Sequence, residues 1–546
     1  MAENDDQWLW FDEDESELTP LRVETGATDG KSAATSAEVV KAIQLHLAGK
    51  TEEALKELKR GIDIGKSLSE IYPALGQIYF ELKKYDDAAA MYGNLVMLDR
   101  KHKTGFYNQG VCLERAGAYK EAAESFRNAV EVDPDRKEAR LGLGISLLRA
   151  GEPEKALDHF NAYLRVDADQ ETALFGRGVA LHMLGRVNDA MEAYRKIATK
   201  KPNSAAVLAN LISVSLTRND NGSAKEYADK LIRIQPQSRA AIQGLAALAL
   251  AAGKFDQAAQ RCAELVKITP DSFEAQFNLA ISYHKLGKLD QAIRAYNDAL
   301  RIRPNSEKVL VNLGVAQQEK GDLKQARKAY ETALQAQPDL PTALWNMAII
   351  AGEQGDAEEA AILYAEAVAK KPDWEEAWFR LGYWQLQQED YKSSIEAFAN
   401  CVKRRPDWAD AQLNLAIAYW RTGEKAPART ALEKAHSAQP KSADILRALT
   451  ALTIEMNDLD KAVAYQSKLN QLGDRSAEIA YNLGIALHSA KRLDDAAKAY
   501  TQALAANPEF AEANLNLGHV LKSLGKEDEA RACWNKALAM KPNLVQ

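Results

Sequence analysis

The chain has 546 residues, of which 46% are hydrophobic and 27% are charged, and its formal net charge is −7. No apolar run approaches the roughly 20 residues that a membrane-spanning helix needs. The N-terminus is acidic, whereas a secretory signal would be basic and then apolar. These features argue against an integral membrane protein and against a secreted one, so we expect a cytoplasmic location.

Almost all of the negative charge lies in residues 1–34, which carry ten acidic residues against Arg22 and Lys31, a local charge of 2 − 10 = −8. The rest of the chain carries 68 basic and 67 acidic residues, a net charge of +1. A nearly neutral surface gives no support for nucleic acid or an anionic membrane as a principal partner. We therefore expect neither.

The acidic N-terminal segment also contains an aromatic cluster, Trp8, Trp10 and Phe11, between Asp5 and Asp6 on one side and residues 12–15 on the other. Disordered segments normally lack large aromatic side chains. The cluster therefore predicts a disordered tail with a short docking motif that orders on contact with a partner. The alternative is a tail that packs passively on the first helices.

From residue 35 to Leu544 one pattern recurs every 34 residues without an insertion, which gives fifteen repeats. Residues 273–306 show it well. Apolar residues at helical spacing lead to Gly287, a second apolar stripe follows from Asp290, and Pro304 ends the repeat. Each repeat therefore predicts two helices joined by a glycine turn. The repeats begin at residues 35, 69, 103, 137, 171, 205, 239, 273, 307, 341, 375, 409, 443, 477 and 511.

Three positions, counted from the first residue of each repeat, indicate how the helices pack. Position 20 is Ala in fourteen repeats, with Ser394 as the exception, and position 8 is Gly or Ala in thirteen. Position 24 is aromatic in ten repeats. Small residues permit close helix contacts and large ones fill the space between helices, so we expect position 8 to face position 24.

This pattern resembles the tetratricopeptide repeat, and the resemblance covers about nine tenths of the chain. It implies an all-α fold, a right-handed α-solenoid superhelix of 15 consecutive helix-turn-helix repeats over residues 35–544. The acidic tail, residues 1–34, would precede the solenoid, and residues 545–546 would form its C-terminal end.

The sequence offers few candidate catalytic or metal-binding residues. The acid pairs fall at positions 18 and 19, in the first turn of the second helix, where the helix dipole favours carboxylates. Four histidines share position 12 but belong to separate repeats, so they cannot bind one metal ion, and the four cysteines also lie in different repeats. We therefore expect no enzyme activity, no cofactor and no metal. The acid pairs are Glu52–Glu53, Asp86–Asp87, Glu358–Glu359 and Asp494–Asp495, and the histidines are His46, His182, His284 and His488.

In the family that the chain resembles, the first helices of successive repeats line a concave groove that holds extended peptides, and position 6 falls on that lining. Here position 6 is asparagine in eight repeats: Asn108, Asn210, Asn278, Asn312, Asn346, Asn414, Asn482 and Asn516. An amide can donate to one peptide group and accept from another. The row is similar to the asparagine ladder of O-linked N-acetylglucosamine transferases, whose catalytic domain this chain lacks. The alternative is that these residues only follow the repeat consensus.

Six of the nine tryptophans lie between residues 345 and 420. By family resemblance, Trp345, Trp374, Trp408 and Trp420 face the groove or its rim, close to Arg380. Tryptophan and arginine are enriched where binding energy concentrates. We expect the main ligand site here, with ordinary helix packing as the alternative.

The sequence therefore predicts a non-enzymatic scaffold that binds extended segments of partner proteins. A second hypothesis is a substrate-recruiting or regulatory subunit of a separately encoded enzyme, such as a glycosyltransferase. We also expect self-association through the last repeat, because no polar helix covers Ala537 and Leu538.

Overall fold

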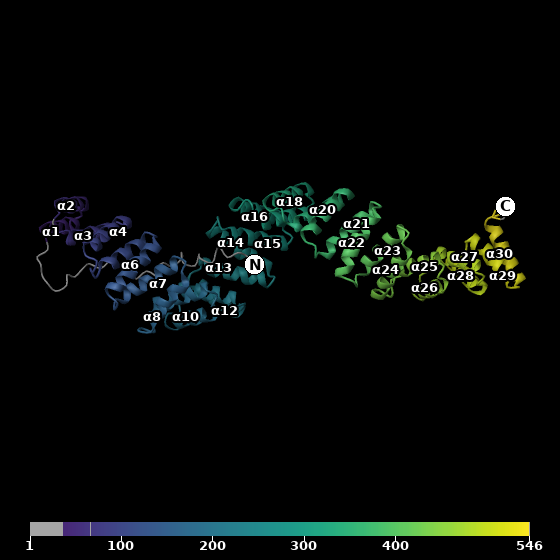
Figure 1. The fold of residues 1–546 in the computed structure, drawn as a ribbon, viewed down its shortest axis with the longest axis horizontal. Helices are drawn as coiled ribbons and strands as arrows, with labels where there is room; N and C mark the ends of the chain where they lie inside the picture. Colours follow the sequence, from purple (N-terminus) through teal and green to yellow (C-terminus); the bar gives the residue numbers. More distant parts are fainter. Residues whose placement is uncertain (1–35, 66, 545–546) are drawn as a thin grey trace. The chain divides into compact units, whose positions relative to one another are not determined.

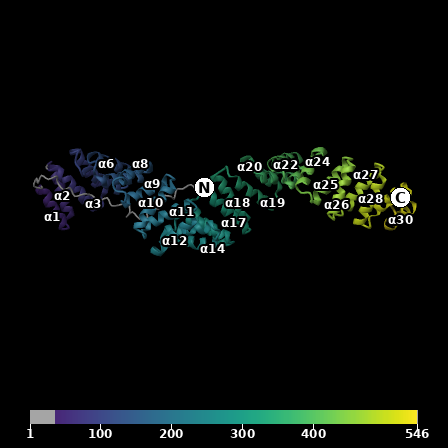
Figure 2. The ribbon, with the colours of Figure 1, turned by 90° about the horizontal axis from the view of Figure 1, so that it is seen from below.

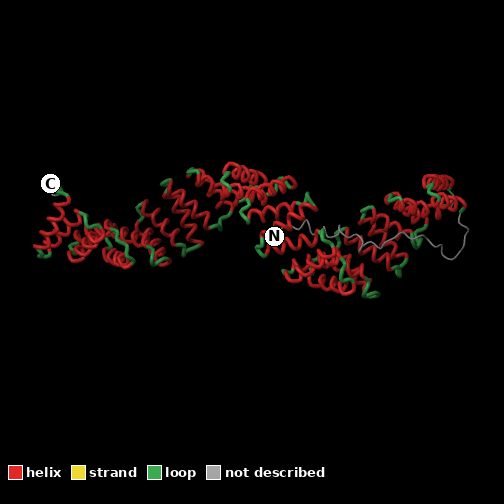
Figure 3. The backbone as a smooth tube through the Cα atoms, turned by 180° about the vertical axis from the view of Figure 1, so that it is seen from behind, coloured by secondary structure: helices red, strands yellow, loops and turns green. Residues whose placement is uncertain are grey.

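The computed structural model describes residues 36–65 and 67–544, and every regular element in these ranges is an α-helix (Figure 3). The all-α solenoid class predicted from the sequence is confirmed. The acidic tail with Trp8, Trp10 and Phe11 and the end at residues 545–546 lie outside the described residues. The division of the chain into tail and solenoid therefore stays a prediction.

The described residues form two compact halves, divided between Ala295 and Tyr296, which we describe separately. The helices of the N-terminal half are α1 (Ala37–Leu47), α2 (Thr51–Ile64), α3 (Leu68–Glu81), α4 (Tyr85–Leu98), α5 (Gly105–Arg115), α6 (Tyr119–Val132), α7 (Lys137–Arg149), α8 (Pro153–Leu164), α9 (Glu171–Met183), α10 (Val187–Lys200), α11 (Ala205–Thr217), α12 (Asn221–Ile234), α13 (Arg239–Ala251), α14 (Phe255–Ile268) and α15 (Phe273–Lys285). The division between the halves falls within α16 (Leu289–Ile302).

The helices of the C-terminal half are α17 (Glu307–Glu319), α18 (Leu323–Ala336), α19 (Pro341–Glu353), α20 (Ala357–Lys370), α21 (Glu375–Gln387), α22 (Tyr391–Arg404), α23 (Ala409–Arg421), α24 (Lys425–Ala438), α25 (Ala443–Glu455), α26 (Leu459–Gln471), α27 (Ala477–Ser489), α28 (Leu493–Ala506), α29 (Ala511–Ser523) and α30 (Glu527–Met540). From α7 onward, every odd-numbered helix begins on the first residue of a repeat expected from the sequence.

The turn inside each repeat needs a residue that tolerates a left-handed backbone. Gly117 and Gly287 have φ values of +81° and +69°, as the glycine pattern predicts. Asn219 and Asn457 take the same conformation, each with a φ of +56°. Asparagine is the residue that most readily replaces glycine there, so the spacing between the two helices is kept.

Consecutive helices pack side by side in chain order within each half (Figures 1 and 2). Successive odd-numbered helices also contact each other directly, as α7 and α9 do, and as α27 and α29 do. Contacts between successive even-numbered helices are sparser. The odd-numbered helices therefore lie closer together, on the inner side of each local stack.

The small residue at position 20 is the most uniform part of the core. Every alanine at this position, from Ala54 to Ala530, has an exposed fraction of 0%. Ser394 is equally buried, and its hydroxyl donates to the carbonyl oxygen of Gly382 at 2.9 Å. The predicted close helix contact is confirmed, and the serine fits because its polar atom has a partner.

Position 8 faces position 24, as predicted. A Cβ atom added to Gly314 would lie 2.4 Å from the ring of Tyr330. The ring of Phe160 meets two glycines, since a Cβ on Gly144 of its own repeat would lie 2.9 Å from it and one on Gly176 of the next repeat 2.3 Å. One aromatic ring thus joins two neighbouring repeats.

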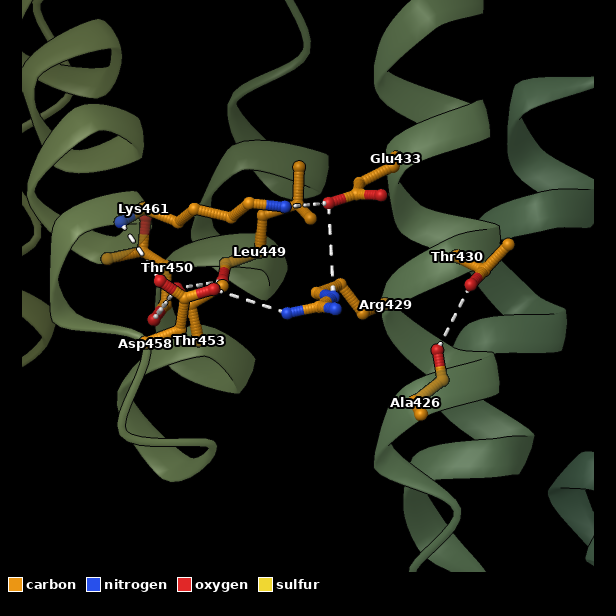
Figure 4. Close-up of polar contacts among 9 residues, drawn as sticks. All are labelled: Ala426, Arg429, Thr430, Glu433, Leu449, Thr450, Thr453, Asp458 and Lys461. Atoms are coloured by element: carbon orange, nitrogen blue, oxygen red, sulfur yellow. Dashed lines mark hydrogen bonds and ion pairs between the residues drawn. The ribbon is translucent and has the colours of Figure 1, made fainter.

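Ion pairs join successive even-numbered helices on the outer side. Between α24 and the N-terminal end of α26, Arg429 Nη1 lies 3.2 Å from Asp458 Oδ2, and Lys461 Nζ lies 2.8 Å from Glu433 Oε1 (Figure 4). Exposed pairs of this kind each contribute about 0–1 kcal/mol. Both pairs connect α24 with α26 across the space between the two helices.

The repeat at residues 443–476 departs most from the consensus, and polar contacts replace the missing packing. Thr450, in place of Gly or Ala, donates to the carbonyl oxygen of Leu446 at 2.8 Å. Asp474, in place of Pro, pairs with Arg447 at 3.0 Å. These substitutions are therefore accommodated locally.

We predict opposite effects for two helical Gly→Ala changes. Gly314→Ala should lower the free energy of unfolding by about 1–3 kcal/mol, because its methyl group overlaps the Tyr330 ring. Gly93→Ala should be neutral or stabilising, because its nearest neighbour at 3.0 Å is the flexible end of Gln109 and alanine favours helix. Urea unfolding of both variants checks this, and an equal loss in both would contradict it.

Candidate functional site

The eight asparagines at position 6 share a place in the repeat but not one environment. Asn108 and Asn210 are buried, with exposed fractions of 2% and 5%. Asn482 is exposed. The other five, Asn278, Asn312, Asn346, Asn414 and Asn516, are half-buried. The row therefore divides into residues that can reach a ligand and residues that cannot.

Asn210 has a structural role. It accepts a hydrogen bond at Oδ1 from the Tyr194 hydroxyl at 3.2 Å, and its Nδ2 donates to the Ala206 carbonyl oxygen at 2.9 Å. Tyr194 is fully buried, which raises its pKa far above the ordinary value. The Asn108 side chain forms a hydrogen bond with the buried Tyr92. For Asn108 and Asn210 the prediction of a groove-facing amide is wrong, because each holds the tyrosine of the preceding repeat.

Two further position-6 asparagines donate a hydrogen bond from the side-chain amide to a partner within the chain. Asn312 Nδ2 donates to the carbonyl oxygen of Lys308 at 2.7 Å, one turn back in α17. Asn516 Nδ2 donates to the Tyr481 hydroxyl at 3.0 Å and so links α29 to α27. Part of the hydrogen-bonding capacity of both side chains is therefore taken.

The remaining four side chains, Asn278, Asn346, Asn414 and Asn482, form no hydrogen bond with any residue of 36–65 or 67–544; we call these the free asparagines. All lie on odd-numbered helices: α15, α19, α23 and α27. A primary amide that is partly exposed and unpaired can both donate to and accept from another backbone.

A sequence signal for this division exists 16 residues upstream, at position 24 of the preceding repeat. Tyr92 and Tyr194 stand there for the two buried asparagines. Phe398, which has no hydroxyl, precedes Asn414. The signal is incomplete, because Tyr330 precedes Asn346 but donates to Gln318 Oε1 at 3.2 Å instead.

Three tryptophans of the C-terminal half, Trp345, Trp374 and Trp408, belong to stacked aromatic pairs. The rings of Trp345 and Trp374 lie 4.6 Å apart with 26° between their planes. Trp408 stacks in the same manner on Phe379, at 4.6 Å and 19°. Each pair joins positions 5 and 34 of one repeat, and Tyr481 and Phe510 occupy the same two positions with centroids 4.7 Å apart and planes tilted by 40°. All of these rings remain half-buried.

A cation lies against each tryptophan pair. Lys371 Nζ is 5.1 Å from the Trp374 ring centroid, and the Arg405 guanidinium is 5.0 Å from that of Trp408. Neither cation, nor the exposed Arg380 at position 6 of α21, forms an ion pair with a described residue. Aromatic surface and available positive charge therefore coincide.

Trp420 belongs to a different contact. Its Nε1 donates to Glu455 Oε2 at 3.0 Å, which connects the ends of α23 and α25. Four of the five aromatic and cationic residues singled out from the sequence thus gather at positions 5, 6 and 34, whereas Trp420 does not join a stacked pair.

Other reactive groups are isolated. The acid pairs lie in first helical turns as predicted, and Glu359 also accepts a bidentate ion pair from Arg327. Burial raises the pKa of the thiols of Cys112, Cys262 and Cys401 to about 12. Such thiols stay protonated and unreactive at neutral pH.

Within residues 36–65 and 67–544, no group of three or more His, Cys, Asp or Glu side chains could hold a metal ion. The same part of the chain contains no helix with the length and hydropathy to cross a lipid bilayer.

The role of Asn210 is testable with a double-mutant cycle. Asn210→Ala should lower the free energy of unfolding by about 1–3 kcal/mol, because it leaves the buried Tyr194 hydroxyl without its acceptor. Adding Tyr194→Phe should recover part of the loss. The matched variant Asn414→Ala, behind Phe398, should change stability by no more than about 0.5 kcal/mol. Equal losses at Asn210 and Asn414 in urea unfolding would refute the assignment.

Two family models, both described as tetratricopeptide repeat, match the chain. One matches residues 74–137, 119–171, 141–205 and 311–373, and the other matches residues 249–313, 385–452 and 487–546. A search of curated proteins finds no match.

Three of the similar solved structures are as follows. "YrrB: a TPR protein with an unusual peptide-binding site" is 20% identical, with 35% of this chain and 98% of that one covered and a TM-score of 0.32. "APC/C hetero-tetramer Cut9-Hcn1" is 14% identical, with 89% and 96% covered and a TM-score of 0.31. "MamA 41-end from Desulfovibrio magneticus RS-1" is 20% identical, with 31% and 96% covered and a TM-score of 0.29.

Matches to the family models run through both halves, and the helix pairs recur at 34-residue spacing. The similarity to the O-linked N-acetylglucosamine transferase repeats stays a prediction. The chain belongs to the tetratricopeptide repeat family, whose helix pairs generally serve as non-catalytic protein-interaction modules.

Proposed function

We propose that the protein is a non-enzymatic scaffold that holds extended segments of partner proteins against its odd-numbered helices. The observation that supports this most is the set of free asparagines on these helices. Three of them, Asn346, Asn414 and Asn482, belong to the C-terminal half, which also carries the stacked aromatic pairs. We call the surface that these residues share in this half the odd-helix face.

The spacing on the odd-helix face suits an extended chain. Packed helices lie about 8–10 Å apart, and an extended strand rises about 3.3 Å per residue. Roughly every third residue of a bound segment could therefore meet the position-6 side chain of the next odd-numbered helix. On α19, α21 and α23 these side chains are Asn346, Arg380 and Asn414.

Two chemistries would combine in such a site. The amides would bind backbone N–H and C=O groups without reading the ligand's side chains. The Trp345–Trp374 and Phe379–Trp408 pairs would contribute apolar surface for side chains in between, and Lys371, Arg380 and Arg405 would favour carboxylates nearby. The result is a face that accepts many extended sequences with a preference for apolar and acidic residues.

The remaining sequence predictions accompany this proposal. They include the cytoplasmic location, the alternative role as a recruiting subunit of a separate enzyme, and the docking motif Trp8, Trp10 and Phe11. No observation within the described residues favours the enzyme-subunit alternative over the scaffold.

The proposal is tested by the combined variant Asn346→Ala, Asn414→Ala and Asn482→Ala. It should lose at least tenfold in affinity for segments that the wild-type chain captures, because each lost amide removes hydrogen bonds worth about 0.5–1.5 kcal/mol. Segments are captured with a photo-crosslinker placed at residue 417, three residues after Asn414 in α23. They are identified by mass spectrometry and then measured as synthetic peptides by fluorescence anisotropy.

The matched control is Asn188→Ala, Asn400→Ala and Asn535→Ala, three asparagines on even-numbered helices. This control should bind as the wild type does. Full affinity in the first variant, with both variants equally helical, would contradict the proposal.

A further inference from the structure

A separate cleft of about 500 Å³ lies in the N-terminal half, between α12 and α14, with α13 beneath it. Leu245 and Leu248 of α13 form its apolar floor and are only half-buried. Because α12 and α14 are even-numbered, the cleft is distinct from the surface that carries the free asparagines. Its volume is within the range of small ligand pockets.

No ion pair between described residues spans the cleft, unlike the space between some other neighbouring even-numbered helices. In the C-terminal half, ion pairs such as Arg327–Glu359 and Arg492–Asp460 bridge neighbouring even-numbered helices. Here Lys225 pairs with Asp229 within α12 and Arg261 pairs with Glu264 within α14, so none of these four side chains spans the gap.

The rim of the cleft has one uncompensated positive charge, that of Lys254, because Lys225 and Arg261 pair with Asp229 and Glu264. Lys225, Lys254 and Arg261 line it together with a single carboxylate, that of Asp229. Lys254 forms no ion pair with a described residue. An apolar floor beside this positive charge is complementary to an aromatic side chain flanked by carboxylates.

The chain itself carries a segment with that chemistry, since Trp8, Trp10 and Phe11 lie between Asp5, Asp6 and the acidic residues 12–15. We propose that residues 5–15 of a second copy of the protein dock in the α12–α14 cleft. The aromatic side chains would cover Leu245 and Leu248, and the carboxylates would face Lys225, Lys254 and Arg261.

The length of chain between residues 5–15 and α1 favours docking in the cleft of a second copy over docking in the cleft of the same copy. If residues 16–35, 20 in number, linked the docked segment to α1 as a random coil, they would span roughly 25 Å. Five repeats separate α1 from α11, and at about 8–10 Å for each packed neighbour the distance is nearly twice that span. A contact between the tail of one copy and the cleft of the next joins unlike surfaces, so it produces chains or rings of copies.

The direct test uses a fluorescent peptide of residues 1–34 and a full-length receptor whose own tail cannot compete, with Trp8→Ala, Trp10→Ala and Phe11→Ala. The peptide should bind this receptor saturably in an anisotropy titration. Adding Lys254→Glu or Leu248→Asp to the receptor should weaken binding at least tenfold. The matched control Lys84→Glu should change it less than twofold, because Lys84 occupies the same N-cap position in α4.

Two further readouts keep the result interpretable. Thermal melting of each receptor shows whether Leu248→Asp unfolds the half, and Lys254→Glu, a surface change, gives the answer without that risk. Sedimentation velocity of the wild type should show association that increases with concentration and is lost in the tail variant and in Lys254→Glu. Absence of peptide binding, or equal binding to Lys254→Glu and Lys84→Glu, would overturn the proposal. The asparagine variants of the odd-helix face should bind the peptide normally, so the two proposals can fail independently.

Discussion

The architecture depends on one contact, an aromatic ring at position 24 packed against backbone that has no Cβ. Phe160 illustrates it, because Gly144 of its own repeat and Gly176 of the next both approach its ring within the space that a methyl group would need. Where it occurs, this contact couples a repeat to its neighbour, and such nearest-neighbour contacts are how solenoids obtain stability without one large core. It also draws the odd-numbered helices together, and so creates the surface on which position 6 lies.

The same contact explains the role of Asn210, although not of every asparagine at position 6, since Tyr330 bonds Gln318 and not Asn346. The residue at position 6 touches the ring of the preceding repeat, so a buried tyrosine there needs a polar partner, and Asn210 supplies it to Tyr194. The residue 16 positions before Asn414 is Phe398, which has no hydroxyl group. The amide of Asn414 therefore has no tyrosine to bond and stays available. One residue type at one repeat position thus has both a structural role and a candidate binding role.

The helical pattern, the turn glycines and the packing of small residues against rings could all be predicted from sequence, because each depends on local spacing within 34 residues. The burial of Asn108 and Asn210 could not, because it requires knowing that position 6 meets a ring 16 residues upstream. Two further features could not be predicted from the sequence: the stacking of Trp408 on Phe379 and the cleft over Leu248. Both depend on which side chains neighbouring repeats leave uncovered. Position-specific patterns describe an average repeat, whereas function here arises from the differences between repeats.

The central claim is that the odd-helix face binds peptide backbone, and ester substitution in a captured segment tests it most directly. Replacing one amide of the segment by an ester removes a backbone donor and leaves every side chain in place. The account predicts that esters at about every third residue each weaken binding by roughly twofold to tenfold. Alanine replacements outside the residues that contact the aromatic pairs should change it less than twofold. Full affinity for every ester variant, with large losses on alanine replacement throughout, would contradict the claim.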